Sequence, residues 1–146
     1  MKLLERRWKK ISLDYGRSFA IEMNKKFKAS CHCGSIELEL FLPNGFDLRR
    51  CNCSICRRKG AIVSSVLIEN LKILKGKDSL KLYQFNTKAA RHYFCSICGI
   101  YTHHQRRSNP QEFSFNTGCV EEFNPEEHPE PALIDGINHV RDNLKM

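Results

Sequence analysis

Eight cysteines carry most of the chemistry that this sequence of 146 residues could perform. Seven of them form three short clusters, Cys31-x-Cys33, Cys51-x-Cys53-x-x-Cys56 and Cys95-x-x-Cys98, and Cys119 stands alone. Closely spaced thiolates are typical of zinc sites, where short spacings supply two tetrahedral corners from one turn. A disulfide framework has no need for sulfurs this close together, so the clusters predict metal binding.

Two of the clusters offer two ligands each. Cys95 and Cys98 precede Gly99, which can adopt backbone conformations closed to other residues, so both thiolates can converge across a turn. Between Cys31 and Cys33, an extended chain would send both side chains to one face. The simplest arrangement is one structural zinc site on Cys31, Cys33, Cys95 and Cys98. His32 would then point away from the metal.

The third cluster, Cys51, Cys53 and Cys56, offers three ligands and leaves one tetrahedral corner open. We call it the triplet. An open corner is typical of a catalytic zinc, where water or a substrate sulfur completes the shell. In the alternative interpretation, Cys119 supplies the fourth ligand, which would make two closed four-thiolate sites and no enzyme. The residues alone leave both interpretations open.

Basic residues and histidines lie close to the cysteine clusters in the sequence. Cations near the triplet favour thiolates and attract anions, although they could merely offset the charge of zinc with three thiolates. The five concerned are Arg49, Arg50, Arg57, Arg58 and Lys59. Neighbouring residues of a strand point to opposite faces, so at most one of His103 and His104 can face the triplet zinc. Structural hydrogen bonding is the expected role of both histidines.

Alternating sequences predict the elements that position the cysteines. Ile36, Leu38, Leu40 and Leu42 alternate with polar residues up to the turn at Pro43-Asn44-Gly45. Further strands are expected at Ala61–Ile68, Leu80–Phe85, Ala89–Phe94 and Glu112–Thr117. Short strands with frequent turns, and no long helical period over 31–120, predict a mainly β domain of antiparallel sheets. The acidic, proline-rich stretch 124–131 is expected to be irregular.

The N-terminal residues differ from the rest of the chain. Apolar residues from Leu4 to Phe19 recur at helical spacing, so residues 1–24 are expected to form an extension that could be helical, before a domain over residues 25–146. Translation could begin at Met23. Charges interrupt every apolar run, which argues against a secretory signal and a membrane span and favours a reducing cytoplasmic location. The net charge of +8 favours anionic partners.

The order and spacing of these residues resemble a known family. From about residue 29 to residue 140, the chain is similar to the glutathione-dependent formaldehyde-activating enzyme family, which also includes centromere protein V-like proteins. The matching motifs are Cys31-His32-Cys33-Gly34, Cys51-x-Cys53-Ser54-x-Cys56-Arg57-Arg58, Phe94-Cys95-x-x-Cys98-Gly99, Asn116-x-x-Cys119 and Asp135-Gly136-x-Asn138-His139.

The resemblance implies a β-tent-like fold with two zinc ions per chain. One would be structural, on Cys31, Cys33, Cys95 and Cys98, and one catalytic, on Cys51, Cys53 and Cys56, which makes Cys119 less favoured as a ligand. The implied activity is that of a carbon-sulfur lyase, S-(hydroxymethyl)glutathione synthase, which joins glutathione or a related small thiol to an aldehyde.

In such an enzyme Arg57 and Arg58 would hold carboxylates of the thiol, and the sequence identifies no residue for the proton. A different class of protein is the alternative: a non-catalytic, zinc-stabilised binding module for nucleic acid. Only the net charge supports it, because the strands lack the alternating basic and aromatic residues of a single-strand binder.

Overall fold

The structure is a computed structural model, and it describes residues 25–138 of the chain. Ten strands lie in this range: β1 (Lys26–Ser30), β2 (Glu37–Phe41), β3 (Arg49–Cys51), β4 (Val63–Leu67), β5 (Leu71–Lys75), β6 (Leu80–Tyr83), β7 (Arg91–Cys95), β8 (Tyr101–Gln105), β9 (Glu112–Asn116) and β10 (Ala132–Ile134). One short α-helix, α2 (Ser54–Lys59), and four single 3-10 turns join them in the same range: η2 (Ile68–Asn70), η3 (Lys77–Ser79), η4 (Thr117–Cys119) and η5 (Pro125–Glu127).

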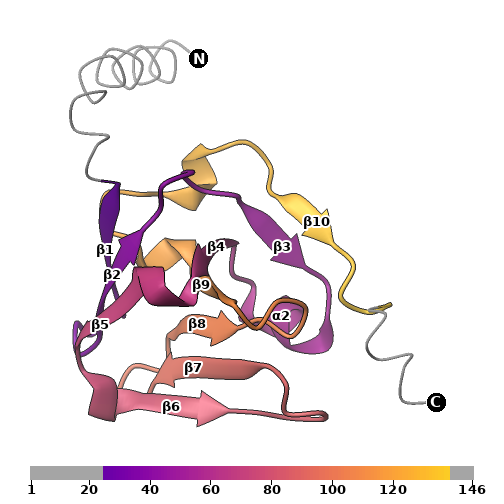
Figure 1. Cartoon of the computed structure of the whole chain (residues 1–146), viewed down its shortest axis with the longest axis horizontal. Coiled ribbons are helices and arrows are strands. Elements are labelled where there is room, and N and C mark those ends of the chain that lie inside the picture. Colours follow the sequence, from indigo (N-terminus) through magenta and orange to yellow (C-terminus); the bar gives the residue numbers. More distant parts are fainter. Residues whose placement is uncertain (1–24, 139–146) are drawn as a thin grey trace.

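Seven strands form the larger sheet, in the order β10-β3-β4-β9-β8-β7-β6. Neighbours run antiparallel except β10 and β3, which run parallel. Figure 1 shows β6, β7 and β8 stacked on one side of the molecule and β3 with β10 on the other, with α2 between them. The helix that contains Cys56 therefore lies between the two ends of the larger sheet.

The smaller sheet has the order β1-β2-β5, and its inner face carries much of the hydrophobic core. Ile36, Leu38, Leu40 and Leu42 are at most 2% exposed, whereas Glu37 and Glu39 lie on the outer face near Lys28 and Lys26 of β1. This alternation is the one that the sequence predicts. Phe115 of β9 reaches the same core from the larger sheet and joins the two layers.

All five predicted strands are present in the structure, and five further strands were missed. The five predicted strands correspond to β2, β4, β6, β7 and β9, with ends that differ by at most two residues. The missed strands are β1, β3, β5, β8 and β10. Three-residue strands such as β3 and β10 are too short to show a period, and β5 has only its first residue buried. The mainly β class is confirmed.

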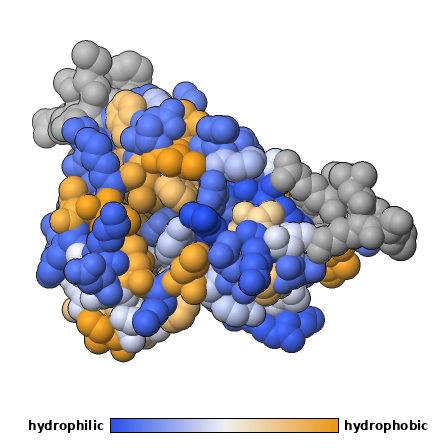
Figure 2. Space-filling model, turned by 60° about the horizontal axis from the view of Figure 1, so that its bottom comes forward, coloured by the Kyte–Doolittle hydropathy of each residue, from blue (hydrophilic) through white to orange (hydrophobic). Residues whose placement is uncertain are grey.

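The ends of the chain and its surface complete the description. The predicted N-terminal helix lies outside the described residues, as does His139. The stretch 124–131 is irregular apart from η5, as expected. No helix within residues 25–138 is long and apolar enough to cross a membrane. On the face shown in Figure 2, hydrophobic residues form separate patches among hydrophilic ones.

Candidate active site

The first and third cysteine clusters meet at one point. The sulfurs of Cys31, Cys33, Cys95 and Cys98 all lie within 4.8 Å of one another. Cys33 Sγ is 3.6 Å from Cys31 Sγ and 3.7 Å from Cys95 Sγ. A tetrahedron with Zn–S bonds of 2.3 Å has edges of about 3.8 Å, so the spacing fits a four-thiolate ion. These four residues could hold a metal ion.

Two turns bring these four sulfurs together. Residues 32–33 form a turn between β1 and β2, with Gly34 N–H donating to Cys31 O, so the expectation that Cys31 and Cys33 share an extended chain is wrong. The second turn uses Gly99 at φ +77° and a hydrogen bond from Gly99 N–H to Cys95 O. Backbone N–H groups of Ile36, Ile97 and Cys98 point at the sulfurs of Cys31 or Cys95. Burial raises the pKa of Cys31 to about 11, although the hydrogen bond from Ile36 opposes that shift.

The triplet lies at the junction between β3 and α2. Cys51 ends the strand, Cys53 is the N-cap residue of the helix, and Cys56 lies in its first turn. Their three sulfurs also lie within 4.8 Å of one another. Hydrogen bonds from Cys51 and Cys56 lower the pKa of Cys53, while the pKa of Cys56 is raised, because the crowded sulfurs share their protons. The triplet could therefore hold a second metal ion.

Cys119 lies apart from the triplet. Its sulfur is 3.7 Å from the carbonyl oxygen of Tyr101, and burial raises its pKa to about 12, with smaller effects from Cys31 and Cys98. Cys119 therefore lies toward the four-thiol cluster without joining it. Within residues 25–138, no fourth cysteine, histidine or carboxylate belongs to the triplet. This geometry favours an open corner over the alternative in which Cys119 closes the site.

Residues 134–137 pass directly over the triplet. Asn52 Oδ1 accepts hydrogen bonds from the backbone N–H groups of Gly136 (2.7 Å) and Ile137 (3.2 Å). A Cβ atom added to Gly136 would lie 2.4 Å from Cys51 Sγ and 2.7 Å from Cys53 Cβ. Glycine is needed here for close approach, since any side chain would collide with the sulfur. The Asp135-Gly136 motif thus forms one wall of the candidate metal site.

A cavity of about 380 Å³ opens beside the triplet. Its walls include the three thiols, three cations (Arg49, Arg106 and Arg107) and two histidines (His92 and His104). Arg49 Nε lies 3.3 Å from Asp47 Oδ2, and Arg106 pairs with Glu112. The cavity therefore combines a cluster of thiols with positive charge and neutral ring nitrogens, which suits a small anionic molecule that carries a reactive sulfur.

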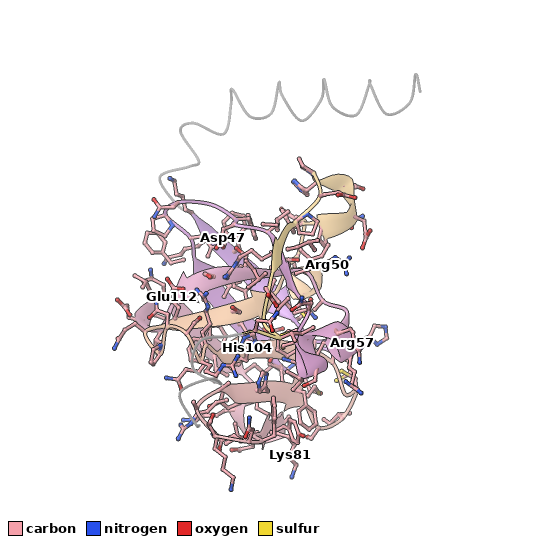
Figure 3. All side chains as sticks on the ribbon, turned by 90° about the vertical axis from the view of Figure 1, so that its right-hand side faces the viewer. Asp47, Arg50, Arg57, Lys81, His104 and Glu112 are labelled. Carbon is pink, nitrogen blue, oxygen red and sulfur yellow. The ribbon has the colours of Figure 1, made fainter. Side chains whose placement is uncertain are left out.

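Arg57 and Arg58 do not line this cavity. Both are exposed on α2, and Arg58 Nη1 donates to the carbonyl oxygen of Ser54 (2.8 Å). In Figure 3, Arg57 lies at the outside of the molecule and His104 in its interior. Carboxylate binding by Arg57 and Arg58 remains a prediction, and the structure adds Arg49, Arg106 and Arg107 as candidates for the same task.

The two adjacent histidines of β8 face opposite ways, as their strand positions predict. His103 hydrogen-bonds Thr102 Oγ1 (2.9 Å), stacks on Tyr93 and meets Phe113 edge-on. His104 lines the cavity instead. His32 is exposed and lies outside both cysteine clusters.

Sequence reasoning did not identify His92 as a cavity residue. Its strand was predicted, but only the pairing of His92 with His104 across β7 and β8 brings it to the triplet. Lys59 was noted for its charge alone. Gly136 was noted as part of a motif. The sequence could not show that its lack of a side chain allows close approach to Cys51, because the two residues are far apart in the chain.

The model of the glutathione-dependent formaldehyde-activating enzyme family matches residues 26–134. The chain belongs to this family. The family match covers all three cysteine clusters, most of the cavity lining and nearly all of the described residues. The proposed boundary at residue 24 remains a prediction.

Two further proteins resemble this family member. A crystal structure of a Rhodobacter sphaeroides protein is 50% identical, covers 73% of this chain and 99% of its own, and superposes with a TM-score of 0.71. A protein of Halomonas elongata, named "Putative glutathione-dependent formaldehyde-activating enzyme", is 28% identical over 79 residues. That match covers 49% of this chain and about half the length of the curated relative.

Proposed function

We propose that this protein is a zinc-dependent carbon-sulfur lyase of the S-(hydroxymethyl)glutathione synthase type. Its substrates would be glutathione, or a related small thiol, and formaldehyde or a similar aldehyde. Family membership supports this choice of substrates. The observation that carries the proposal is a cluster of three thiols, with no fourth ligand among residues 25–138, at the wall of a cationic cavity.

The chain would hold two zinc ions, one on Cys31, Cys33, Cys95 and Cys98 and one on the triplet. When bound at the triplet, zinc would supply a Lewis acid that lowers the pKa of a thiol entering its open corner. Carboxylates of that thiol would be held in the cavity by Arg49, Arg106 and Arg107. The candidates predicted from the sequence, Arg57 and Arg58, lie outside the cavity. Holding the two reactants side by side would supply much of the rate advantage.

The central step is the addition of a thiol to a carbonyl carbon. The S–H bond breaks, a carbon–sulfur bond forms, and the π bond of the aldehyde becomes a hydroxyl group. Because the reaction also occurs without a protein, the acceleration required is modest. The cytoplasmic location remains a prediction that rests on the charges interrupting the apolar runs of the N-terminal residues.

Cobalt substitution tests the open corner directly. Cobalt in the triplet should show fewer than four sulfur ligands, and adding glutathione should change its visible spectrum as a further sulfur joins. Because two cobalt ions would bind, the spectrum of Cys53→Ser serves as the matched control for the four-thiol site. If the triplet spectrum already shows four thiolates and Cys119→Ser removes one, the proposal fails and a closed binding module takes its place.

A further inference from the structure

Lys59 is a buried cation whose partners lie around the triplet. It is the last residue of α2, and its Nζ lies 2.7 Å from His92 Nδ1 and 3.6 Å from the centre of the Tyr101 ring. No carboxylate of the described residues lies within ion-pair distance of it. Burial lowers the pKa of Lys59 to about 8, against the opposing effect of the three thiols. The thiols of the triplet are its nearest negative charges.

This lysine determines which nitrogen of His92 carries hydrogen. Burial, and then the charge of Lys59, lower the pKa of His92 to about 4, so the ring is neutral near pH 7. A neutral ring has one donor and one acceptor nitrogen, and an ammonium group can only donate. Nδ1 therefore accepts from Lys59, and Nε2 carries the hydrogen.

His92 Nε2 faces the cavity as a free donor. Within residues 25–138 it has no hydrogen-bond partner, yet it is not among the fully enclosed polar atoms, and the residue lines the cavity. The ring is fixed between two others: its centroid lies 4.8 Å from that of His104 and 5.9 Å from that of Phe85. His92 thus presents one oriented N–H group beside the triplet.

A β-bulge aligns the residues beneath this group. His92 pairs directly with His104, whereas the register between β7 and β8 shifts at Tyr93/Phe94 and skips Thr102. The extra residue lets Tyr101 and His104, three positions apart, meet on one side, where Tyr101 Oη lies 2.6 Å from His104 Nδ1. Tyr101 also donates to Ser114 O (3.2 Å) and so keeps its ring under Lys59. The bulge makes one connected set of Lys59, His92, His104 and Tyr101.

We propose that His92 is a catalytic residue, whose Nε2–H binds the aldehyde oxygen and passes it a proton, and that Lys59 is the positioning residue that fixes this tautomer. The inference rests on the proposed function, because it assigns the proton of that reaction. His104 and Tyr101 hold the His92 ring and the lysine in place.

The proton step balances as follows. The thiolate sulfur bonds to the carbonyl carbon, the C=O π bond breaks, and its electron pair moves to oxygen. His92 Nε2 gives its proton to that oxygen while Nδ1 takes one from Lys59. Once the product has left, Nδ1 returns its proton to Lys59, and Nε2 takes from solvent the proton that the thiol released on ionising. Nothing is oxidised or reduced, and the product is a hemithioacetal, which for formaldehyde is the S-hydroxymethyl adduct of the thiol.

Nitrogen-15 NMR of the zinc-loaded protein tests the tautomer without measuring activity. The wild-type protein should show His92 with hydrogen on Nε2 and a bare Nδ1. Lys59→Met should abolish that preference, whereas Lys81→Met, which removes a lysine from the exposed strand β6, should preserve it. Hydrogen on Nδ1 in the wild-type protein, or an unchanged tautomer in Lys59→Met, would overturn the proposal.

Kinetics and metal content test the catalytic role. His92→Gln should lower kcat for glutathione and formaldehyde roughly 100-fold or down to the uncatalysed rate, with little change in KM and no loss of zinc. His103→Gln is the matched control: it removes a buried histidine from the other side of β8 and should keep kcat even if the melting temperature falls.

Three outcomes would contradict the catalytic role of His92. Wild-type kcat in His92→Gln would overturn it while the proposed function stands, and loss of one zinc ion in that variant would show that His92 is instead a ligand. A wild-type protein that does not accelerate the reaction overturns the proposed function and the role of His92 with it.

Discussion

At the scale of single residues, Asn52 and Gly136 show how closely the triplet is enclosed. Asn52 lies between two of the thiols and uses its side-chain oxygen to bind the backbone of Gly136 and Ile137. Its amide also reaches Asp135 Oδ1 at 3.4 Å. One polar side chain thus keeps a distant part of the chain against the sulfurs.

Gly136→Ala should weaken this contact. The new methyl group would meet Cys51 Sγ and the Cys53 side chain, so residues 134–137 must move away. Overpacking of this kind costs about 1–3 kcal/mol in the free energy of unfolding, and we expect looser metal binding at the triplet. Urea denaturation and competition with a chelator would measure both. Gly118→Ala, whose methyl group would meet only the Asn116 side chain at 3.2 Å, is the control; equal effects would contradict the contact with Cys51.

At the scale of elements, the weakest junction of the larger sheet is reinforced by a side chain. β3 and β4 share a single residue pair, Arg49 and Val63. Asp47, just before β3, accepts hydrogen bonds from Ser64 Oγ (2.6 Å) and Ser65 N–H (2.7 Å) of β4. The hydrogen bonds of this carboxylate therefore join β3 to β4 where few backbone hydrogen bonds do, and they hold in place the strand that ends at Cys51.

This junction predicts a pH dependence of stability. Burial raises the pKa of Asp47, but the hydrogen bonds from Ser64 and Ser65 and the charge of Arg49 outweigh it, so the pKa is lower than usual. Its contribution is complete above the unfolded value of about 3.9 and is lost as the pH falls through the folded value. Urea denaturation at pH 6 and pH 3 should show a larger loss for the wild-type protein than for Asp47→Asn.

The exposed Asp78 of η3 provides the control for this pH dependence. Asp78→Asn should follow the wild-type protein at both pH values, because no hydrogen bond of the described structure depends on its carboxylate. Equal losses in the wild-type protein and Asp47→Asn would show that the junction does not depend on ionised Asp47.

Local patterns predict elements of this chain only where they are long enough. The alternation in β2 and the cysteine spacings are visible in the sequence, because each depends on neighbouring residues. β10 pairs with β3, which is distant in the sequence, and the bulge in β8 depends on the register with β7, so the local residue pattern does not reveal either feature. The same holds for the cavity: the thiols and the neighbouring Arg49 were predictable, but His92 and Arg106 reach the cavity through the register of the sheet.

At the scale of the whole molecule, the four-thiol cluster connects the two sheets. Cys31 and Cys33 lie between β1 and β2 of the smaller sheet. In the larger sheet, Cys95 ends β7 and Cys98 lies in the turn that leads to β8. Cys33 and Cys95 are 62 positions apart, yet their sulfurs nearly touch. A metal ion at this point would close a long loop and join both layers of the core.

Cys95→Ser and Cys53→Ser should therefore differ. We expect two zinc ions in the wild-type protein and one in Cys53→Ser, which should stay folded. Cys95→Ser opens the long loop and should lose about 4 kcal/mol or more in the free energy of unfolding, because metal binding at this cluster is part of the folding free energy. Elemental analysis and circular dichroism melts measure both. Equal destabilisation would mean that the structural and catalytic roles are assigned wrongly.

The order of the clusters along the chain also determines when each cluster is completed during translation. The triplet is complete once residue 56 has been made, whereas Cys31 and Cys33 must wait for Cys95 and Cys98. Gly136, which covers the triplet, follows about 80 residues later, or roughly 4–16 s at ordinary rates of translation. During that interval the three thiols would be open to a metal donor, before the residues that later cover them have been made.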